Sequence, residues 1–419
     1  MKIKRRDFLG SVVGSITLAS FPGIRTGYAQ GNIESADTRG NIFKGVTITK
    51  VESAKITGKR PRVVGRNSHL GVHGQIVKES IVRLTTNTGI SGWGHSRAKE
   101  DDASKILGKN LCDLFDPENG TSEEFLKFDF SLWDLAGKLT GKSVHSMLGD
   151  RGCKEVPVYD GSIYFDDLDL ETGADRGIQP ILDNVEWAVN KGFRAFKLKV
   201  GRGFKWMEKK KGLKRDLDVI FAVRDLIGPD VKLFIDSNIG YTLAEMKEVI
   251  SRTADANLFL VEEPFPEARE DFVAFKRFLR RNGYGTLIAL GENAPGHEAR
   301  FLNFIKSGLV DVVQWDMRGY TLSRWLKFMP VIEESGTITA PHNWYSHLGG
   351  YYIAQFGRGC PYFGIGEIDS VEMPGVISTG YQLADGFMTV PDSPGFGLRL
   401  DDTIFSSALH EKDAWTVTL

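Results

Sequence analysis

Three acidic residues, Asp236, Glu262 and Glu292, stand at or near the ends of successive apolar runs and form a candidate metal site. The runs are "VKLFIDSN" (231–238), "LFLVEEP" (258–264) and "LIALGEN" (287–293). Three facing carboxylates repel one another, and their pKa values rise unless a cation neutralises them. Oxygen ligands without a thiolate suit Mg²⁺, with Mn²⁺ as a possible substitute. Glu263 is an alternative to Glu262 that could instead face the wall of the fold and bind a lysine.

Two lysines, Lys197 and Lys199, lie in the apolar run "FRAFKLKV" (193–200). Side chains two residues apart in a strand point to the same face, so both enter the same space. A second ammonium disfavours the charged form of Lys199, which predicts a lowered pKa and a role as a base, with Lys197 as its tuner. The alternative is an edge strand with two solvated lysines.

Asp316, His342 and Glu367 end three later runs, "VDVVQWD" (310–316), "TITAPHN" (337–343) and "YFGIGE" (362–367). A carboxylate beside an imidazole orients it and supports its protonated form, so Asp316 and His342 are a candidate dyad. His347 is a rival for the histidine position. Glu367 is either an electrophile near the metal or a salt-bridge partner.

The elements that carry these residues repeat along the chain. Eight apolar runs begin at 156, 193, 231, 258, 287, 310, 337 and 362, so their starts are 23 to 38 residues apart. Stretches such as "DLDVIFAVRDLIG" between them have the periodicity of amphipathic helices. Eight strand-then-helix units predict a (β/α)8-type barrel whose active site lies at the C-terminal ends of the strands. A doubly wound sheet is the competing architecture, but it does not require eight such units.

The remaining segments predict a second domain. Residues 43–92 alternate apolar and polar positions as strands do, and 122–149 have helical spacing. We therefore predict an α+β capping domain over 31–153, a barrel over 154–374, and a C-terminal segment, 375–419, that returns to the cap.

The first 30 residues resemble an export signal. A basic start with Arg5 and Arg6 precedes an apolar run from Phe8 to Phe21 and small residues up to Ala29. The paired arginines in "RRDFLG" predict a twin-arginine-type signal and a periplasmic location. A chance basic N-terminus is the alternative.

The composition excludes several partners. Lys plus Arg number 53 against 54 for Asp plus Glu, and a net charge of -1 gives no reason to expect binding to nucleic acid or to a membrane. Three scattered cysteines predict neither disulfides nor a zinc site.

These motifs together resemble the enolase superfamily, and within it the mandelate racemase and muconate lactonizing enzyme family. The matching segments are "KLK" (197–199), "DSN" (236–238), "VEEP" (261–264), "GEN" (291–293), the strand-seven histidine and "FSLWDLAGKLTGKSVHSMLG" (130–149). The segment "QWDMRGYT" (314–321) departs from the glycine-rich sequence usual there.

The resemblance implies that a Mg²⁺ site binds a substrate carboxylate. It implies that Lys199 takes the proton α to that carboxylate, giving an enediolate held by the metal, with the His342–Asp316 dyad on the opposite face. Glu367 takes the place of the carboxyl group that donates to the enediolate. The family habit also implies a homo-oligomer.

Two outcomes follow from one enediolate. A proton returned by His342 makes a racemase or epimerase, whereas a protonated His342 that helps a β-hydroxyl leave makes a dehydratase yielding a 2-keto-3-deoxy acid. We predict a hydro-lyase acting on a sugar acid, a small-molecule carboxylate. Lactonization of an unsaturated diacid is disfavoured by the strand-seven histidine. An exported solute-binding protein would need neither three metal carboxylates nor the lysine pair.

The predicted substrate-binding residues surround the mouth. They are Asn238, Arg318 and Asn343, with Tyr320, Trp344 and Tyr345 nearby, although aromatic and amide groups there often only pack. The loop Asn67–Gly74 carries His69 and His73 and is either a lid that reaches the distal end of the substrate or an exposed hairpin connection.

Overall fold

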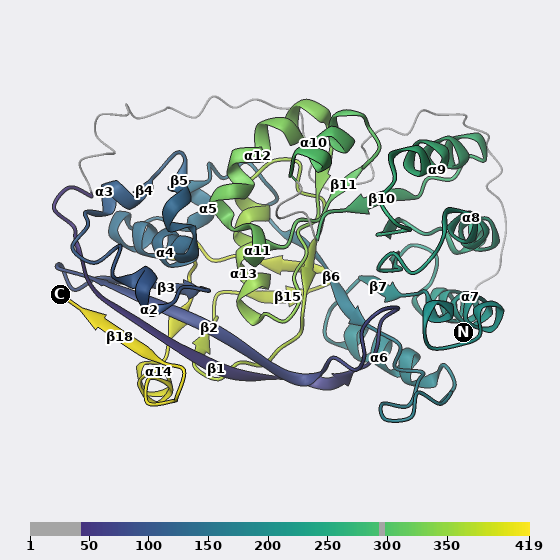
Figure 1. Cartoon of the computed structure of the whole chain (residues 1–419), viewed down its shortest axis with the longest axis horizontal. Coiled ribbons are helices and arrows are strands. Elements are labelled where there is room, and N and C mark those ends of the chain that lie inside the picture. Colours follow the sequence, from purple (N-terminus) through teal and green to yellow (C-terminus); the bar gives the residue numbers. More distant parts are fainter. Residues whose placement is uncertain (1–42, 293–297) are drawn as a thin grey trace.

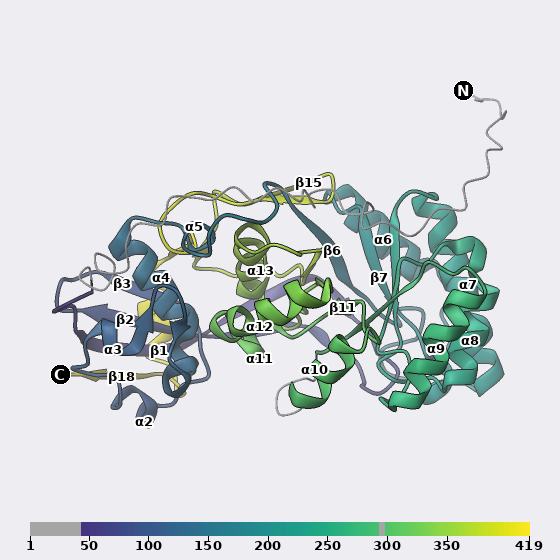
Figure 2. The same cartoon turned by 90° about the horizontal axis from the view of Figure 1, so that it is seen from above.

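The structure, a computed structural model, describes residues 43–292 and 298–419, and the predicted signal at 1–30 lies outside them. Two main sheets divide the chain (Figure 1). An antiparallel sheet with its helices forms one end of the molecule, and a larger, mainly parallel sheet with long helices forms the other (Figure 2).

The antiparallel sheet has the strand order β18-β1-β2-β3. Its strands are β1 (Ile48–Val64), β2 (Gly74–Thr86), β3 (Ser91–His95) and β18 (Trp415–Thr418). Residues of β1 and β2 alternate between buried and exposed positions, as expected of a sheet with one face on a core. Helix α4 (Asp129–Thr140) covers this face so closely that a Cβ added at Gly92 would meet Leu135 at 2.4 Å.

The two ends of the chain meet in this sheet. Lys50 of β1 stands opposite Thr418 of β18 in an antiparallel pair. The β1–β2 hairpin is long enough to run from this end of the molecule to the parallel sheet (Figure 1). There, buried Arg60 bonds Asp369, at 2.7 and 2.6 Å, which joins the hairpin to the segment after the last parallel strand.

The eight apolar runs of the sequence each contain or adjoin a strand of the larger sheet. The strands are β6 (Val156–Ile163), β7 (Ala195–Lys199), β8 (Lys232–Asp236), β9 (Leu260–Glu262), β10 (Leu287–Leu290), β11 (Val312–Val313), β12 (Ile338–Thr339) and β13 (Gly366–Ile368). Neighbours from β6 to β12 pair in parallel and in chain order, and β13 pairs in parallel with β6. Beyond β12, Thr339 donates its N–H to Tyr362 and accepts one from Gly364, at 2.9 and 2.7 Å. Antiparallel β16 (Phe387–Thr389) and β15 (Gln382–Ala384) extend the other side of β6, so the sheet is mixed.

Helices connect the parallel strands and lie outside them (Figures 1 and 2). They are α6 (Gln179–Asn190), α7 (Lys209–Ile227), α8 (Leu243–Arg252), α9 (Arg269–Arg281), α10 (Glu298–Lys306), α12 (Leu322–Ser335) and α13 (His347–Gly359). Local sequence fixes their starts, as at α8, where Thr242 and Glu245 form a capping box. None of the helices within 43–292 and 298–419 has the length and hydropathy that a bilayer crossing requires.

Candidate active site

One face of the parallel sheet carries an apolar layer with a polar layer directly beyond it. Nine buried side chains form the apolar cluster: Tyr159, Ala195, Phe234, Leu260, Ala289, Val312, Ile338, Ala340 and Ile365. Side chains two residues further along a strand share the same face. At six of these positions the next residue on that face is polar: Lys197, Asp236, Glu262, Gln314, His342 and Glu367. The period of the strands therefore brings the polar groups together above an apolar floor.

Asp236, Glu262 and Glu292 approach one another closely enough to share a cation. One carboxylate oxygen from each lies within 4.8 Å of the others. Asp236 and Glu262 are buried, and the Glu262 oxygen Oε1 has no hydrogen-bond partner among the described residues. Burial and the charge of Asp236 raise the pKa of Glu262 to about 7. A bare buried oxygen beside two further carboxylates fits a divalent cation with hard oxygen ligands.

The two lysines bind these carboxylates. Lys197 Nζ lies 2.9 Å from Glu262 Oε2, 2.8 Å from Glu367 Oε1 and 3.5 Å from Asp236 Oδ2. Lys199 Nζ contacts Asp236 Oδ2. Both side chains are buried within a sheet strand, so the solvated-edge alternative is wrong.

The expected direction of the Lys199 pKa shift is also wrong. Burial and the charge of Lys197 do lower the pKa of Lys199, but Asp236, with Tyr164 and Glu292, outweighs them together and the net shift is upward. The carboxylates likewise raise the pKa of Lys197 despite its burial. In this arrangement the second ammonium is a minor influence beside the acids.

His342 and Asp316 form the predicted pair. His342 Nδ1 lies 2.9 Å from Asp316 Oδ2, and Nε2 lies 3.1 Å from Glu292 and 3.7 Å from Glu367. Although burial lowers the His342 pKa, these carboxylates raise it to about 10. Asp316 also caps α11 (Met317–Tyr320) by accepting the N–H of Gly319, which fixes the carboxylate. His347 instead lies beside Tyr351, 3.3 Å from its hydroxyl.

Glu367 connects the lysine side of the site to the histidine side. Its Oε1 contacts Lys197, and its Oε2 accepts the backbone N–H of Asn343 at 3.1 Å. The carboxylate lies against the backbone of Gly161 in β6, where an added Cβ would be 1.8 Å from Oε1. Glycine at 161 therefore makes room for Glu367.

Glu263 and Asn238 occupy strained turns beside the acidic triad. Both have positive φ, 42° and 44°, which is uncommon outside glycine. Asn238 donates its side-chain N–H to Glu263 at 3.4 Å and its backbone N–H to Asp236 at 2.8 Å. Burial and the charge of Glu292 raise the pKa of Glu263 well above its usual value.

The loop with the two histidines packs on the ends of the parallel strands. His73 Nδ1 accepts the indole N–H of Trp344 at 3.3 Å, and its ring lies 4.7 Å from that of Tyr164. Tyr164 in turn lies beneath the ammonium of Lys199, at 5.0 Å. His69 packs at 4.2 Å on Phe204.

The predicted substrate contacts Arg318 and Asn343 bond to protein groups. Arg318 donates to the backbone oxygen of Trp344 and lies 3.7 Å from buried Glu79 of β2. Asn343 donates its side-chain N–H to Ser346 at 3.1 Å. Both side chains therefore bond to protein groups in this structure.

Two residues near the site escaped the sequence reasoning. Gln314 donates its side-chain N–H to Glu262 Oε2 at 2.8 Å, and Tyr164 packs under Lys199. Gln314 could have been found from its position two residues beyond Val312 on the same strand face. Tyr164 follows β6 and had no comparable signal.

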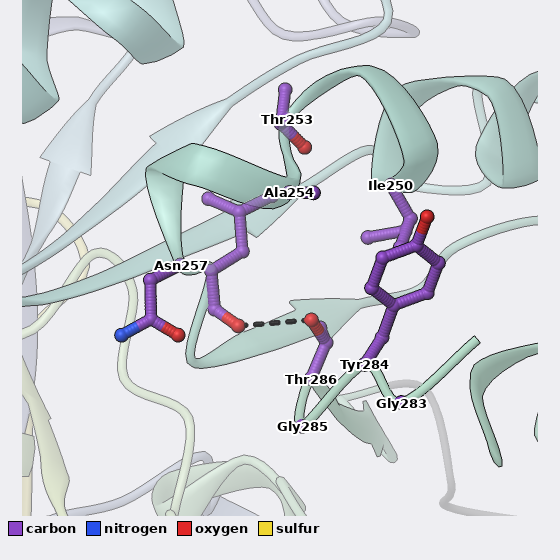
Figure 3. Close-up of a pocket in the computed structure, with 9 residues that line it drawn as sticks. Ile250, Thr253, Ala254, Asn257, Gly283, Tyr284, Gly285 and Thr286 are labelled. Carbon is purple, nitrogen blue, oxygen red and sulfur yellow. Dashed lines mark hydrogen bonds between the residues drawn. The ribbon is translucent and has the colours of Figure 1, made fainter. Parts of the chain in front are cut away.

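A separate small pocket lies away from these acids (Figure 3). Its volume is about 110 Å³, and a hydrogen bond of 3.0 Å from Thr286 to Leu258 crosses it. It is lined by Ile250, Thr253, Ala254, Asn257, Leu258, Gly283, Tyr284, Gly285 and Thr286. No lining residue is ionisable except Tyr284, so we assign it no chemistry.

Comparisons with known proteins identify the family of the chain. Residues 181–404 match the family model described as Enolase C-terminal domain-like. A D-galactarolactone cycloisomerase of Agrobacterium fabrum is 30% identical over 74% of this chain and 80% of its own length. A D-gluconate/D-galactonate dehydratase of Picrophilus torridus is 25% identical over 79% and 88%.

Solved structures of related enzymes have the same fold as this chain. A galacturonate dehydratase from a Geobacillus species, solved with magnesium, superposes with a TM-score of 0.84 at 30% identity, covering 89% of this chain and 97% of that one. A second structure of that enzyme contains D-galacturonate and 5-keto-4-deoxy-D-galacturonate.

An α/β protein with three carboxylates, two lysines and a histidine at the ends of parallel strands is an enzyme that acts beside a bound cation. The chain belongs to the enolase superfamily, in the family of mandelate racemase and muconate lactonizing enzyme. Its named relatives are mainly dehydratases, which are hydro-lyases.

This membership corrects the predicted location. The periplasmic assignment is wrong, because homologous enzymes of the superfamily are cytoplasmic. It depended only on the order of basic, apolar and small residues within 1–30, which lie outside the described residues.

Proposed function

We propose that the chain dehydrates a sugar acid to a 2-keto-3-deoxy acid by removing the proton α to a carboxylate. The observation that carries the proposal is the position of Lys199 and His342, which flank the triad of Asp236, Glu262 and Glu292. The similarity of this chain to the Geobacillus dehydratase, which was solved with D-galacturonate, supports a sugar acid as the substrate class.

The proposed roles follow from the contacts. A Mg²⁺ ion held by the triad would supply positive charge to the substrate carboxylate and to the negative charge that develops there. Binding of a cation by the triad would relieve the ion pair with Asp236 that raises the Lys199 pKa, so that the free amine of Lys199 would accept the α proton. His342 would give a proton to the departing β-hydroxyl, so that water leaves and the enol becomes the 2-keto acid. Lys197 and Asp316 hold Glu262 and His342 in place, and Glu367 pairs with Lys197 beside them.

Dehydration is favoured over racemisation or epimerisation by the surroundings of His342. Both ring nitrogens face carboxylates, which only accept hydrogen bonds, so the ring donates at both positions. An imidazole held in this form is suited to protonate a leaving group. Cycloisomerisation of a sugar lactone is a second candidate, favoured by the 30% identity to the Agrobacterium enzyme.

We also infer the finer architecture. The hydrogen bonds of Thr339 to 362–364 and the pairing of β13 with β6 support closure of the parallel strands into a barrel over 154–374. The antiparallel sheet would belong to a cap over 31–153, joined by 375–419 through β18. A homo-oligomer remains the expected assembly.

The test is a screen of sugar acids with Mg²⁺, including D-galacturonate, aldonates and aldarates. Formation of 2-keto acid, epimerisation and exchange of the α proton in deuterated water would be followed in the same samples. Lys199→Ala should lower exchange by at least about 100-fold, the usual contribution of a general base. Lys214→Ala is the control, because Lys214 is exposed and pairs only with Asp218 on the same helix.

The outcomes separate the alternatives. Turnover of an acid sugar that Lys199→Ala abolishes supports the proposal. Exchange confined to aryl or amino acid derivatives would refute the dehydratase. Binding of a sugar acid with neither exchange nor turnover would indicate a solute-binding protein.

A further inference from the structure

Gln314 is an uncharged residue buried among the charges of the site. It follows β11, its backbone N–H donates to Leu290 of β10 at 2.8 Å, and its side chain is 1% exposed. The amide nitrogen donates to Glu262 Oε2 at 2.8 Å and reaches the hydroxyl of Tyr159 at 3.5 Å. The opposite amide orientation would turn its oxygen toward a carboxylate, and two acceptors cannot bond.

The two carboxylate oxygens of Glu262 therefore differ in their hydrogen bonds. Oε2 receives two donors, Gln314 at 2.8 Å and Lys197 at 2.9 Å. Oε1 is buried and receives none from the described residues. Two bonds on one oxygen fix the rotation of the carboxylate and leave the other oxygen as the ligand atom.

We propose that Gln314 is a positioning residue for the cation: its amide holds Glu262 so that Oε1 faces the place between Asp236, Glu262 and Glu292. The inference rests on the proposed function, since it assumes that this triad binds Mg²⁺. In this inference Gln314 acts on the cation through its hydrogen bond to Glu262.

Lys197 alone cannot supply this orientation. Its ammonium is shared by Glu262, Glu367 and Asp236, and a point charge attracts all three without a preferred direction. The planar amide of Gln314 has fixed bond directions, and its nitrogen also donates to the hydroxyl of Tyr159 at 3.5 Å. As a neutral donor it also orients the carboxylate without adding a positive charge that would repel the cation.

The experiment measures the affinity of the full chain for Mg²⁺ alone, by isothermal titration calorimetry. Gln314→Met keeps the length of the side chain and removes both donors. Gln314→Asn keeps the amide but retracts it by one methylene, and serves if the methionine variant does not fold. Loss of a group that orients a metal ligand weakens binding by about 10- to 100-fold, and we expect this of both variants.

Gln355→Met is the matched control. Gln355 is a glutamine with no exposed surface that donates to Tyr381 at 2.8 Å and lies on α13, outside the site. It should lose thermal stability as Gln314→Met does but keep the wild-type Mg²⁺ affinity. A purely structural role for Gln314 would make the two variants behave alike.

Two results would overturn the inference, and they differ. Unchanged Mg²⁺ affinity in the Gln314 variants, with a wild-type chain that binds Mg²⁺, refutes the role of Gln314 and leaves the proposed function standing. A wild-type chain that does not bind Mg²⁺ refutes the cation site and both proposals together.

Discussion

Replacing Gly161 by alanine should disable the site without replacing any charged group. The new Cβ would lie 1.8 Å from Glu367 Oε1, whereas ordinary contacts begin at 3.4 Å, so the carboxylate must move by about 1.5 Å. Because Glu367 Oε1 is 2.8 Å from Lys197 and Oε2 is 3.1 Å from the N–H of Asn343, a shift of that size breaks both contacts. Misplacement by about 1 Å can cost ~100-fold in rate, and we expect a fall in kcat of at least that order.

The assay is steady-state formation of 2-keto acid, with kcat and KM determined separately on the substrate found by the screen. Gly285→Ala is the control, because a Cβ there meets no atom within 4 Å. In a Glu367→Asp background the overlap with the shorter side chain is relieved, so Gly161→Ala should cost much less than in the wild type. Wild-type kcat for Gly161→Ala, or a crystal structure of it in which Glu367 still bonds Lys197, would refute the reasoning.

Two further predictions concern stability. Burial lowers the pKa of His73 to about 4, below its unfolded value, so stability present above about pH 6.5 should be lost as the pH falls toward 4, by at most about 3 kcal/mol. Urea unfolding should show this loss in the wild type and not in His73→Phe, and equal pH slopes for the two would contradict it. Arg202 is buried between Asp167 and Asp216, and Arg202→Met should lower the free energy of unfolding by about 3–5 kcal/mol because two buried carboxylates lose their cation. Arg252→Met, in an exposed pair, should change it by less than about 0.5 kcal/mol, and similar losses for the two variants would show that the buried network is not stabilising.

The charged residues at the strand ends could be predicted from sequence because side chains alternate every two residues along a strand, and a short apolar run marks a buried strand. Once a run such as "VKLFIDSN" is known to be a buried strand, the face of Asp236 follows from that of Phe234. The same rule brings Lys197 and Glu262 together although they are 65 residues apart in the chain, provided that their runs become parallel strands on either side of β8. The repetition of strand and helix supplied that condition.

The sequence could not predict the directions of long side chains or the signs of pKa shifts, because tertiary contacts set both. Arg318 lies in the expected segment, yet its guanidinium turns to the Trp344 backbone and to Glu79, a residue of the distant β2. The sign of the Lys199 pKa shift depended on Asp236, whose distance no local pattern gives. Gln314 was overlooked because a neutral amide attracts attention only when its carboxylate partner is known.

The balance of charge in the site explains why a divalent cation, and not substrate alone, completes it. The buried and partly buried charged groups of the site are the carboxylates Asp236, Glu262, Glu292, Asp316 and Glu367 and the cations Lys197, Lys199 and His342. Burial and the neighbouring carboxylates raise the pKa of Glu263, which disfavours its charged form, so we leave it out of the count. Five carboxylates against three cations leave an excess of two negative charges, and unpaired charge inside a protein is costly. An excess of negative charge raises the pKa of a carboxyl group, as seen for Glu262, whose pKa is raised to about 7. A carboxylate substrate would add a third negative charge. One Mg²⁺ removes the excess, so binding of the cation should precede and permit binding of the sugar acid.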